Sequence, residues 1–329
     1  MLCGTRISAV FTTLALTAGA ATGCGGTQDA PSTDTGGEVT REVGADTRVS
    51  IATGNATGVY FSLGNGYAEQ VSAATDGTVK ATAAETGASV QNIQQLVRGS
   101  YQVAFSLADT AADAVEGKGG FEGEQQPVQE LSRIYPNYTQ VIARADSNIT
   151  SVADMRGKRV STGSPGSGTE VIANRLLETA GLDPQSDVAA QRLDLTKTVD
   201  GMKDGSIDAL FWSGGLPTPG ITDLMTSARD DVVFLDITPQ LAAMQEVSTA
   251  YEEGVIPAAA YGLPGDVETI VVPNMLLVRD DVDDANLACV LTRTLFERQP
   301  ELAQVVGAAR GIDLDSARDT ALDELNAPR

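Results

Sequence analysis

Two clusters of glycine and hydroxyl residues are the places in this sequence where ligand chemistry can be expected. The first lies between a short apolar alternation and a segment of helical spacing, and consists of Thr53, Gly54, Asn55, Thr57 and Gly58. The second is the run GSPGSGTE over residues 163–170. Glycines let a ligand approach the backbone closely, and the N–H groups in the first turn of a helix have no partner within that helix. Such clusters can bind a small anionic or zwitterionic ligand, although a plain strand-to-helix turn has the same pattern.

Composition excludes several classes of chemistry. The 329-residue chain contains no histidine, which removes His-based triads, general bases and metal ligands. Of its three cysteines, Cys3 and Cys24 lie near the start and Cys289 sits in an apolar helical pattern, so neither a zinc site nor a disulfide framework is predicted. The formal charge of −22 argues against nucleic acid, and the second cluster lacks the lysine of a phosphate-binding loop. We therefore expect no metal, no cofactor and no nucleic-acid partner.

The elements that must position these clusters follow an alternating order. A strand at residues 49–51 and a helix at residues 60–71 flank the first cluster, and a strand at residues 158–162 and a helix at residues 171–180 flank the second. Further strands are predicted at residues 79–83, 103–107, 139–143, 209–212, 232–237 and 268–278. Further helices are predicted at residues 90–98, from 108 onward, 196–203, 238–251, 284–298, 301–309 and 314–322. This alternation predicts an α/β fold with mostly parallel sheets, whose ligands bind at the carboxyl ends of strands. Pro273 within the last strand indicates an edge strand or a crossing between domains.

The first 23 residues have the pattern of an export signal. Arg6 supplies a positive start, and residues 7–21 are mostly apolar and small. The sequence ATGC ending at Cys24 resembles a bacterial lipobox, which implies cleavage before Cys24 and lipid attachment to it; ordinary cleavage near residues 18–20 is the alternative. Residues 24–45 are rich in Gly, Thr, Asp and Ser and are predicted to be a disordered tether. We therefore expect an exported protein, lipid-anchored at the outer face of the cell membrane or periplasmic.

Several strings of the chain resemble one known family. They are GNATGVYFSLG, ETGASVQN, SLADTAADA, RADSNITSVADMRGKRVSTGSPGSGTE, DALFWSGGLPTPGITDL and IPAAAYGLPGDVETIVV. In this order and spacing they resemble the TAXI family, the solute-binding subunits of tripartite ATP-independent periplasmic (TRAP) transporters. The resemblance covers residues 49–324 and implies a two-lobed periplasmic-binding-protein-like (type II) fold. Lobe I would take residues 46–140 and 268–329, lobe II residues 141–267, with the ligand cleft between them.

The resemblance also implies which residues line the cleft. They come from the turns that follow five predicted strands: Thr53, Gly54, Thr57, Gly58, Tyr60, Thr86, Gly87, Ser89, Ser106, Asp109, Ser164, Gly166, Ser167, Gly168, Thr169, Trp212, Ser213 and Gly214. In this interpretation the glycines and hydroxyls bind a carboxylate, and Tyr60 and Trp212 form walls with one polar atom each. Glu85 or Asp109 would bind an ammonium group. Tyr135 is expected to be a packing residue.

The function that follows is that of a binding protein that delivers a solute to the membrane permease of a TRAP transporter. Family members associated with ligands mostly bind glutamate- or glutamine-like amino acids or C4–C5 dicarboxylates. A sensory surface lipoprotein with the same fold is the alternative. An exported enzyme would need a Ser–Lys pair or paired carboxylates, and no lysine lies near a suitable serine. We therefore expect the protein not to be an enzyme.

Overall fold

A computed structural model describes residues 43–44, 46–281 and 285–317, which belong to one compact unit. The predicted signal peptide, Cys24 and the tether up to residue 42 lie outside these residues. So does the end of the predicted helix at residues 314–322, of which residues 314–317 form turns.

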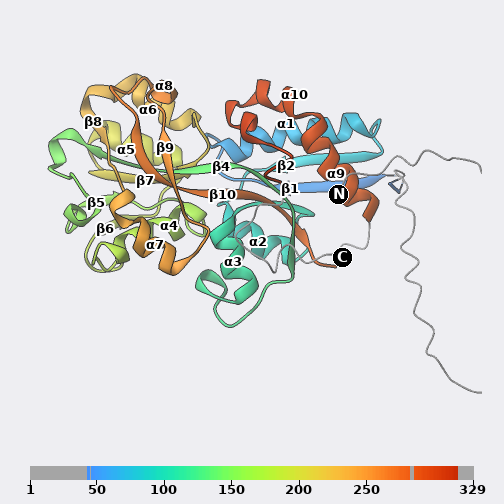
Figure 1. Ribbon diagram of the computed structural model, residues 1–329, viewed down its shortest axis with the longest axis horizontal. Coiled ribbons are helices and arrows are strands. Elements are labelled where there is room, and N and C mark those ends of the chain that lie inside the picture. The colour runs from blue at the N-terminus through green and yellow to red at the C-terminus, as the bar shows by residue number, and fades with distance from the viewer. Residues whose placement is uncertain (1–42, 45, 282–284, 318–329) are drawn as a thin grey trace, which may run out of the picture. The chain divides into compact units, whose positions relative to one another are not determined.

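The described strands form one ten-stranded sheet of mixed direction (Figure 1). Its order is β2-β1-β3-β10-β4-β7-β5-β6, with β8 paired to β4 and β9 to β10. The strands are β1 (Thr47–Ala52), β2 (Val79–Ala84), β3 (Val103–Leu107), β4 (Val128–Arg144), β5 (Arg159–Ser161), β6 (Ala189–Gln191), β7 (Ala209–Gly214), β8 (Val232–Phe234), β9 (Glu252–Ile256) and β10 (Val267–Arg279). Pairs at the two ends of this order are parallel, whereas β10 and β4 run antiparallel to their neighbours.

Helices join the strands and cover the sheet (Figure 1). They are α1 (Val59–Ala74), α2 (Ser89–Val97), α3 (Ala108–Glu116), α4 (Gly168–Thr179), α5 (Leu195–Asp204), α6 (Pro219–Ala228), α7 (Leu241–Val247), α8 (Ala258–Tyr261), α9 (Ala285–Glu297) and α10 (Gln299–Val305). None of the helices within the described ranges is long and apolar enough to cross a membrane.

Helix α1 illustrates how the apolar pattern selects an element. Val59, Leu63, Tyr67 and Val71 recur at helical spacing and are all at most 2% exposed. Burying each of them stabilises the fold by roughly 1.5–3 kcal/mol relative to exposure. The Tyr67 hydroxyl donates a hydrogen bond to the Leu291 carbonyl of α9 at 2.7 Å, so α1 also positions the C-terminal helices (Figure 1). The predicted strand–turn–helix unit around the first cluster is confirmed.

Of the two interpretations of Pro273, an edge strand or a crossing between domains, the structure overturns the edge strand. β10 lies inside the sheet, between β3 and β4. Pro273 pairs in register with Pro136 of β4, so neither residue has an N–H to donate at this position. On the other side of β10, residues 267–271 pair with β9 and residues 274–277 pair with β3. The proline is tolerated because it sits where the strand exchanges one neighbour for another.

Several boundaries differ from the prediction. β4 spans Val128–Arg144, whereas only residues 139–143 were expected, because Pro136 and Asn137 interrupt its apolar pattern. The helix expected at residues 238–251 ends at Val247, where Ser248 adopts an extended conformation. Cys289, which lies in the apolar pattern of α9, is half-buried.

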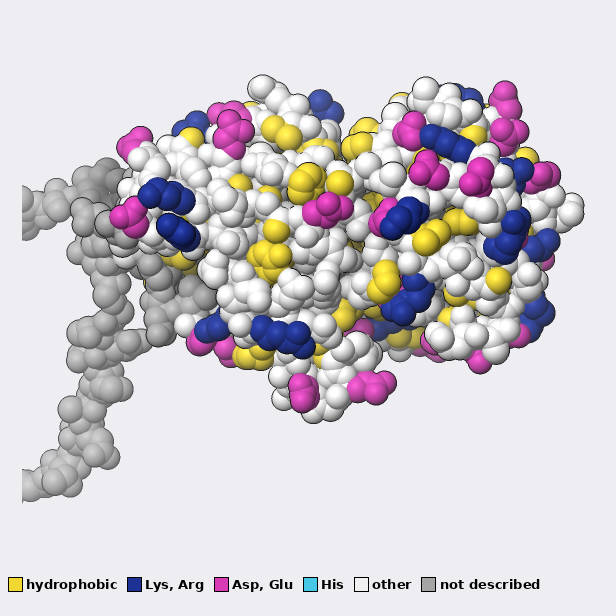
Figure 2. All heavy atoms as spheres, turned by 180° about the vertical axis from the view of Figure 1, so that it is seen from behind, with side chains coloured by type: hydrophobic (Ala, Val, Ile, Leu, Met, Phe, Trp, Pro, Cys, Tyr) yellow, Lys and Arg dark blue, Asp and Glu magenta, His cyan; other side chains and the backbone are white. Residues whose placement is uncertain are grey.

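Charged side chains are dispersed over the surface. On the face shown in Figure 2, Lys and Arg side chains lie among Asp and Glu and do not gather into one patch. Exposed ion pairs of this kind include Lys80–Asp46 at 2.7 Å and Arg298–Glu301 at 3.2 Å. Pairs so exposed contribute little to stability.

Candidate ligand-binding site

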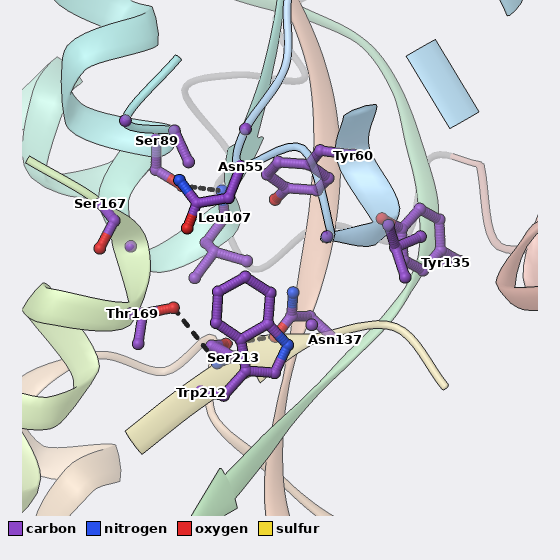
Figure 3. A pocket seen from close by; sticks show the side chains of 17 residues that line it. Asn55, Tyr60, Ser89, Leu107, Tyr135, Asn137, Ser167, Thr169, Trp212 and Ser213 are labelled. Carbon is purple, nitrogen blue, oxygen red and sulfur yellow. Dashed lines mark hydrogen bonds between the residues drawn. The ribbon is translucent and has the colours of Figure 1, made fainter. Parts of the chain in front are cut away.

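A pocket lies where the turns after several strands meet (Figure 3). It is lined by Gly54, Asn55, Gly58, Val59, Tyr60, Gly87, Ala88, Ser89, Leu107, Tyr135, Asn137, Ser167, Gly168, Thr169, Trp212, Ser213 and Gly214. None of these residues carries a charged side chain, so the pocket can recognise a ligand only through neutral donors, acceptors and apolar surface.

Three helices begin at this pocket. α1 follows Gly58, α2 follows Ala88 and α4 follows Ser167, and all three preceding residues are among the lining residues. The N–H groups of a first helical turn have no intrahelical partner, and the helix dipole is positive there. The three N-termini together make the pocket favourable for a negatively charged group.

Hydroxyl groups add donors beside these helix starts. Ser167 Oγ accepts the Glu170 N–H at 3.0 Å, and Thr169 Oγ1 accepts the Ser213 N–H at 3.2 Å. Because each oxygen already accepts a backbone N–H, its own hydrogen can be donated to a ligand. Ser89 Oγ likewise accepts the Leu107 N–H at 3.2 Å.

A second group of polar side chains is bonded internally. The Tyr60 hydroxyl donates to Asn274 Oδ1 at 2.6 Å, and Asn137 Nδ2 donates to the same oxygen at 3.0 Å. The Ser213 hydroxyl donates to Asn137 Oδ1, and Asn274 Nδ2 donates to the Tyr135 carbonyl at 2.9 Å. Burial raises the pKa of the Tyr60 hydroxyl well above its usual value, which keeps it a neutral donor. This network fixes the polar wall of the pocket.

Close packing explains two of the glycines. A Cβ on Gly168 would lie 2.5 Å from Leu107 Cδ1 at the end of β3 and 2.7 Å from Ser89 Oγ of α2, so glycine lets the start of α4 approach these two residues closely. A Cβ on Gly58 would lie 3.3 Å from the Trp212 indole, which lies against the start of α1. Trp212 Nε1 donates to Thr218 Oγ1 at 3.1 Å, which holds the indole in place.

The structure brings most of the predicted cleft residues to this pocket. Those that line it are Gly54, Gly58, Tyr60, Gly87, Ser89, Ser167, Gly168, Thr169, Trp212, Ser213 and Gly214. Those that do not are Thr53, Thr57, Thr86, Ser106, Asp109, Ser164 and Gly166. The hydroxyls of the second set are bonded to the protein: for example, Thr53 donates to the Ala84 carbonyl at 2.6 Å, and Thr86 donates to Asn92 Oδ1 at 2.6 Å.

Asp109, expected to bind an ammonium group, is placed behind the pocket. It is fully buried and bonded to Arg175 of α4 at 2.9 Å and to the Tyr251 hydroxyl. Arg175 also pairs with both oxygens of Asp113, at 2.6 and 2.8 Å. Glu85, the other candidate, accepts the Ala56 N–H at 3.1 Å and is not among the lining residues. Neither carboxylate supplies a charge to the pocket.

Lining residues outside the predicted set of cleft residues are Asn55, Val59, Ala88, Leu107, Tyr135 and Asn137. Asn55 belongs to the first glycine and hydroxyl cluster, and Tyr135 was expected to be a packing residue. The first four lie beside predicted residues in the same turns, and their position there is the signal that could have found them. Tyr135 and Asn137 belong to the part of β4 that was not predicted as a strand.

Direct hydrogen bonds connect the predicted lobes around the pocket. Asn55 Oδ1 accepts the Ser164 hydroxyl and the Leu195 N–H, both at 3.2 Å. The Gln91 N–H donates to the Gly166 carbonyl at 3.1 Å, and the Gly220 N–H donates to the Thr57 carbonyl at 3.2 Å. Turns of predicted lobe I thus contact turns of predicted lobe II on more than one side of the pocket.

Comparison with known proteins gives the family. The model of the NMT1-like family matches residues 51–326, and the chain belongs to this family. A solved structure of a protein from Bordetella bronchiseptica RB50 is similar, at 19% identity over 84% of this chain and 87% of that chain, with a TM-score of 0.56. The binding protein component of an ABC phosphonate transporter from Pseudomonas aeruginosa is similar at 13% identity over 81% and 80% of the chains, with a TM-score of 0.54. The predicted periplasmic-binding-protein-like α/β fold is confirmed.

Proposed function

We propose that this protein is an extracytoplasmic solute-binding protein that captures a small carboxylated solute and delivers it to a transporter in the membrane. The observation that carries the proposal is the convergence of three helix N-termini on one pocket without charged side chains. A carboxylate needs several donors at one point, and this arrangement supplies them from backbone and hydroxyl groups. The fold of a transporter binding protein supports the same function.

The carboxylate is assigned to the start of α4. Gly168 and Thr169 offer first-turn N–H groups, Ser167 and Thr169 offer two hydroxyl hydrogens, and Ser89 lies across from them (Figure 3). Trp212 and Tyr60 cover the apolar part of the solute. The proposed class extends from glutamate- and glutamine-like amino acids to C4–C5 dicarboxylates.

Capture would proceed by closure of the two predicted lobes. The bonds that Asn55 accepts from Ser164 and Leu195 can form only when the lobes approach each other. A solute that contacts both lobes stabilises the closed arrangement by its differential affinity for it. No lining residue is a carboxylate, thiol or amine, which supports binding without catalysis.

For the transporter we propose the TRAP type, on the resemblance to the TAXI family, with a lipid anchor on Cys24 that keeps the protein at the outer face of the cell membrane. A neighbouring gene for a fused TRAP permease would support transport, whereas a neighbouring sensor kinase would favour a sensory lipoprotein. Labelling with radioactive palmitate, lost on Cys24→Ala, tests the anchor.

The test of the site is ligand-induced thermal stabilisation of the chain without residues 1–23. A solute at a hundred times its Kd adds about 2.7 kcal/mol to the free energy of unfolding. We expect stabilisation by members of a panel of amino acids and mono- and dicarboxylates, and its loss in the double variant Ser167→Ala, Thr169→Ala. Ser151→Ala is the matched control, because it removes a similar cap, from the 3₁₀-helix Val152–Met155, outside the pocket lining. If only phosphate or sugars stabilised the protein, the proposal that the solute is a carboxylate would be wrong.

A further inference from the structure

One buried polar atom at the pocket has no partner. The hydroxyl oxygen of Tyr135 on β4 is buried, the residue is 1% exposed, and no hydrogen-bond partner for the oxygen exists within the described residues. Tyr135 is also a lining residue, and Figure 3 places it at the side of the pocket opposite Ser167. A buried hydroxyl without a partner costs about 1–3 kcal/mol, so its retention points to a group that it meets on binding.

The neighbouring polar groups do not meet this need. Tyr60 and Asn137 both donate to Asn274 Oδ1, and the Ser213 hydroxyl donates to Asn137. The Asn274 side chain donates to the backbone carbonyl of Tyr135 and not to its hydroxyl. The Tyr135 hydroxyl is therefore without a hydrogen-bond partner among the described residues, although the polar side chains around it are bonded to one another. Burial raises its pKa well above the usual value, so it remains a neutral hydroxyl at physiological pH.

Within the part of the chain that the structure describes, the pocket has no charged lining side chain that could balance a second ionic group. Its lining contains no Lys, Arg, Asp or Glu, and the nearby carboxylate of Asp109 is already paired with Arg175. A second carboxylate or an ammonium group at the Tyr135 side would be buried without an ion-pair partner, which is strongly unfavourable.

We propose that the solute is a monocarboxylate whose far end carries an uncharged hydrogen-bonding group, and that the Tyr135 hydroxyl binds this group. The carboxylate lies at the start of α4, and an amide or hydroxyl lies at the Tyr135 side. The inference rests on the proposed function and narrows its solute class. Tyr135 is thus a specificity residue, where the sequence indicated packing.

The experiment is calorimetric titration with matched carboxylates of three to six carbons. At each length one end is a carboxylate, and the other end is a methyl, an amide, a hydroxyl or a second carboxylate. The proteins are the unsubstituted chain, Tyr135→Phe and the control Tyr138→Phe, which removes the same atom from the same strand outside the pocket lining. We expect the amide or hydroxyl series to bind at least about 10-fold more tightly than the methyl and dicarboxylate series. Tyr135→Phe should weaken only the amide or hydroxyl compounds, by roughly 3- to 10-fold.

The outcomes separate the two proposals. If dicarboxylates bind most tightly, or if Tyr135→Phe weakens methyl and amide compounds equally, this inference is overturned while carboxylate binding stands. If no compound of any length binds, the carboxylate class itself is wrong, and this inference fails with it.

Discussion

At the scale of single residues, two buried carboxylates share one guanidinium behind the pocket. Asp109 and Asp113 of α3 both pair with Arg175 of α4, whose side chain is 12% exposed. An ion pair of this kind gains little over an apolar replacement, but removing one partner leaves the others buried and uncompensated. Arg175 is therefore predicted to matter for stability, although it does not line the pocket.

We predict that Arg175→Met lowers the free energy of unfolding by about 3–5 kcal/mol, because it leaves two buried carboxylates without a cation. Urea unfolding at pH 7 measures this. Arg298→Met, which breaks the exposed pair with Glu301, is the control and should change stability little. Equal effects of the two variants would contradict the assignment.

The same cluster predicts a pH dependence. Burial, with the charge of Asp109 nearby, raises the pKa of Asp113 above its usual range. The folded protein therefore binds this proton more tightly than the unfolded chain does. The contribution of Asp113 to the free energy of unfolding is then largest below the unfolded pKa of about 3.9 and decreases as pH rises through the folded pKa. Asp113→Asn should remove this decrease in the free energy of unfolding, measured by urea titrations from about pH 3.5 upward. If the pH dependence of the variant equals that of the unsubstituted protein, Asp113 is not its source.

At the scale of elements, the sequence predicted the units that are local and missed what depends on distant partners. The apolar spacing of α1 and the glycine turns before α1 and α4 were readable from neighbouring residues. The pairing of Asp109 with Arg175 could not be predicted in this way, because Arg175 lies 66 positions away along the chain. Tyr135 and Asn137 were not predicted as cleft residues because Pro136, between them, argues against a strand in the sequence. This part of β4 is a strand because it pairs with β10, which is distant along the chain.

The close approach of the start of α4 to α2 and to the end of β3 gives an element-scale prediction. Gly168→Ala places a methyl group 2.5 Å from Leu107 Cδ1 and 2.7 Å from Ser89 Oγ, so these two pocket side chains or the start of α4 must shift. Overpacking of this kind costs about 1–3 kcal/mol, and we expect a matching loss of solute affinity in calorimetry. Gly265→Ala, where a Cβ meets nothing within 4 Å, should leave affinity unchanged. Unaltered binding by the Gly168 variant would show that this approach is not needed.

At the scale of the whole molecule, the pocket depends on contacts between the predicted lobes. Asn55 is central to them, since its side-chain oxygen accepts bonds from both Ser164 and Leu195. Each such bond stabilises the closed arrangement by about 0.5–1.5 kcal/mol. The population of closed molecules should therefore be sensitive to this one side chain.

We predict that Asn55→Ala shifts the solute-free protein toward open molecules and increases its radius of gyration in small-angle X-ray scattering. The matched control is Asn65→Ala, which removes an exposed side chain bonded within α1 at 2.7 Å. Identical scattering of the two variants would mean that Asn55 does not hold the lobes together.

The pairing of Pro136 with Pro273 has a mechanical consequence. All pairing between the strands β1–β3 and the strands β5–β7 passes through β4 and β10. Pro136 of β4 pairs with Pro273 of β10 at the place where the other neighbour of β10 changes from β9 to β3. Neither proline donates an N–H at this cross-section of the sheet, and we expect it to act as the hinge of lobe motion. Amide hydrogen exchange of the residues beside the two prolines should then slow when a solute binds, whereas the ends of both strands should not change.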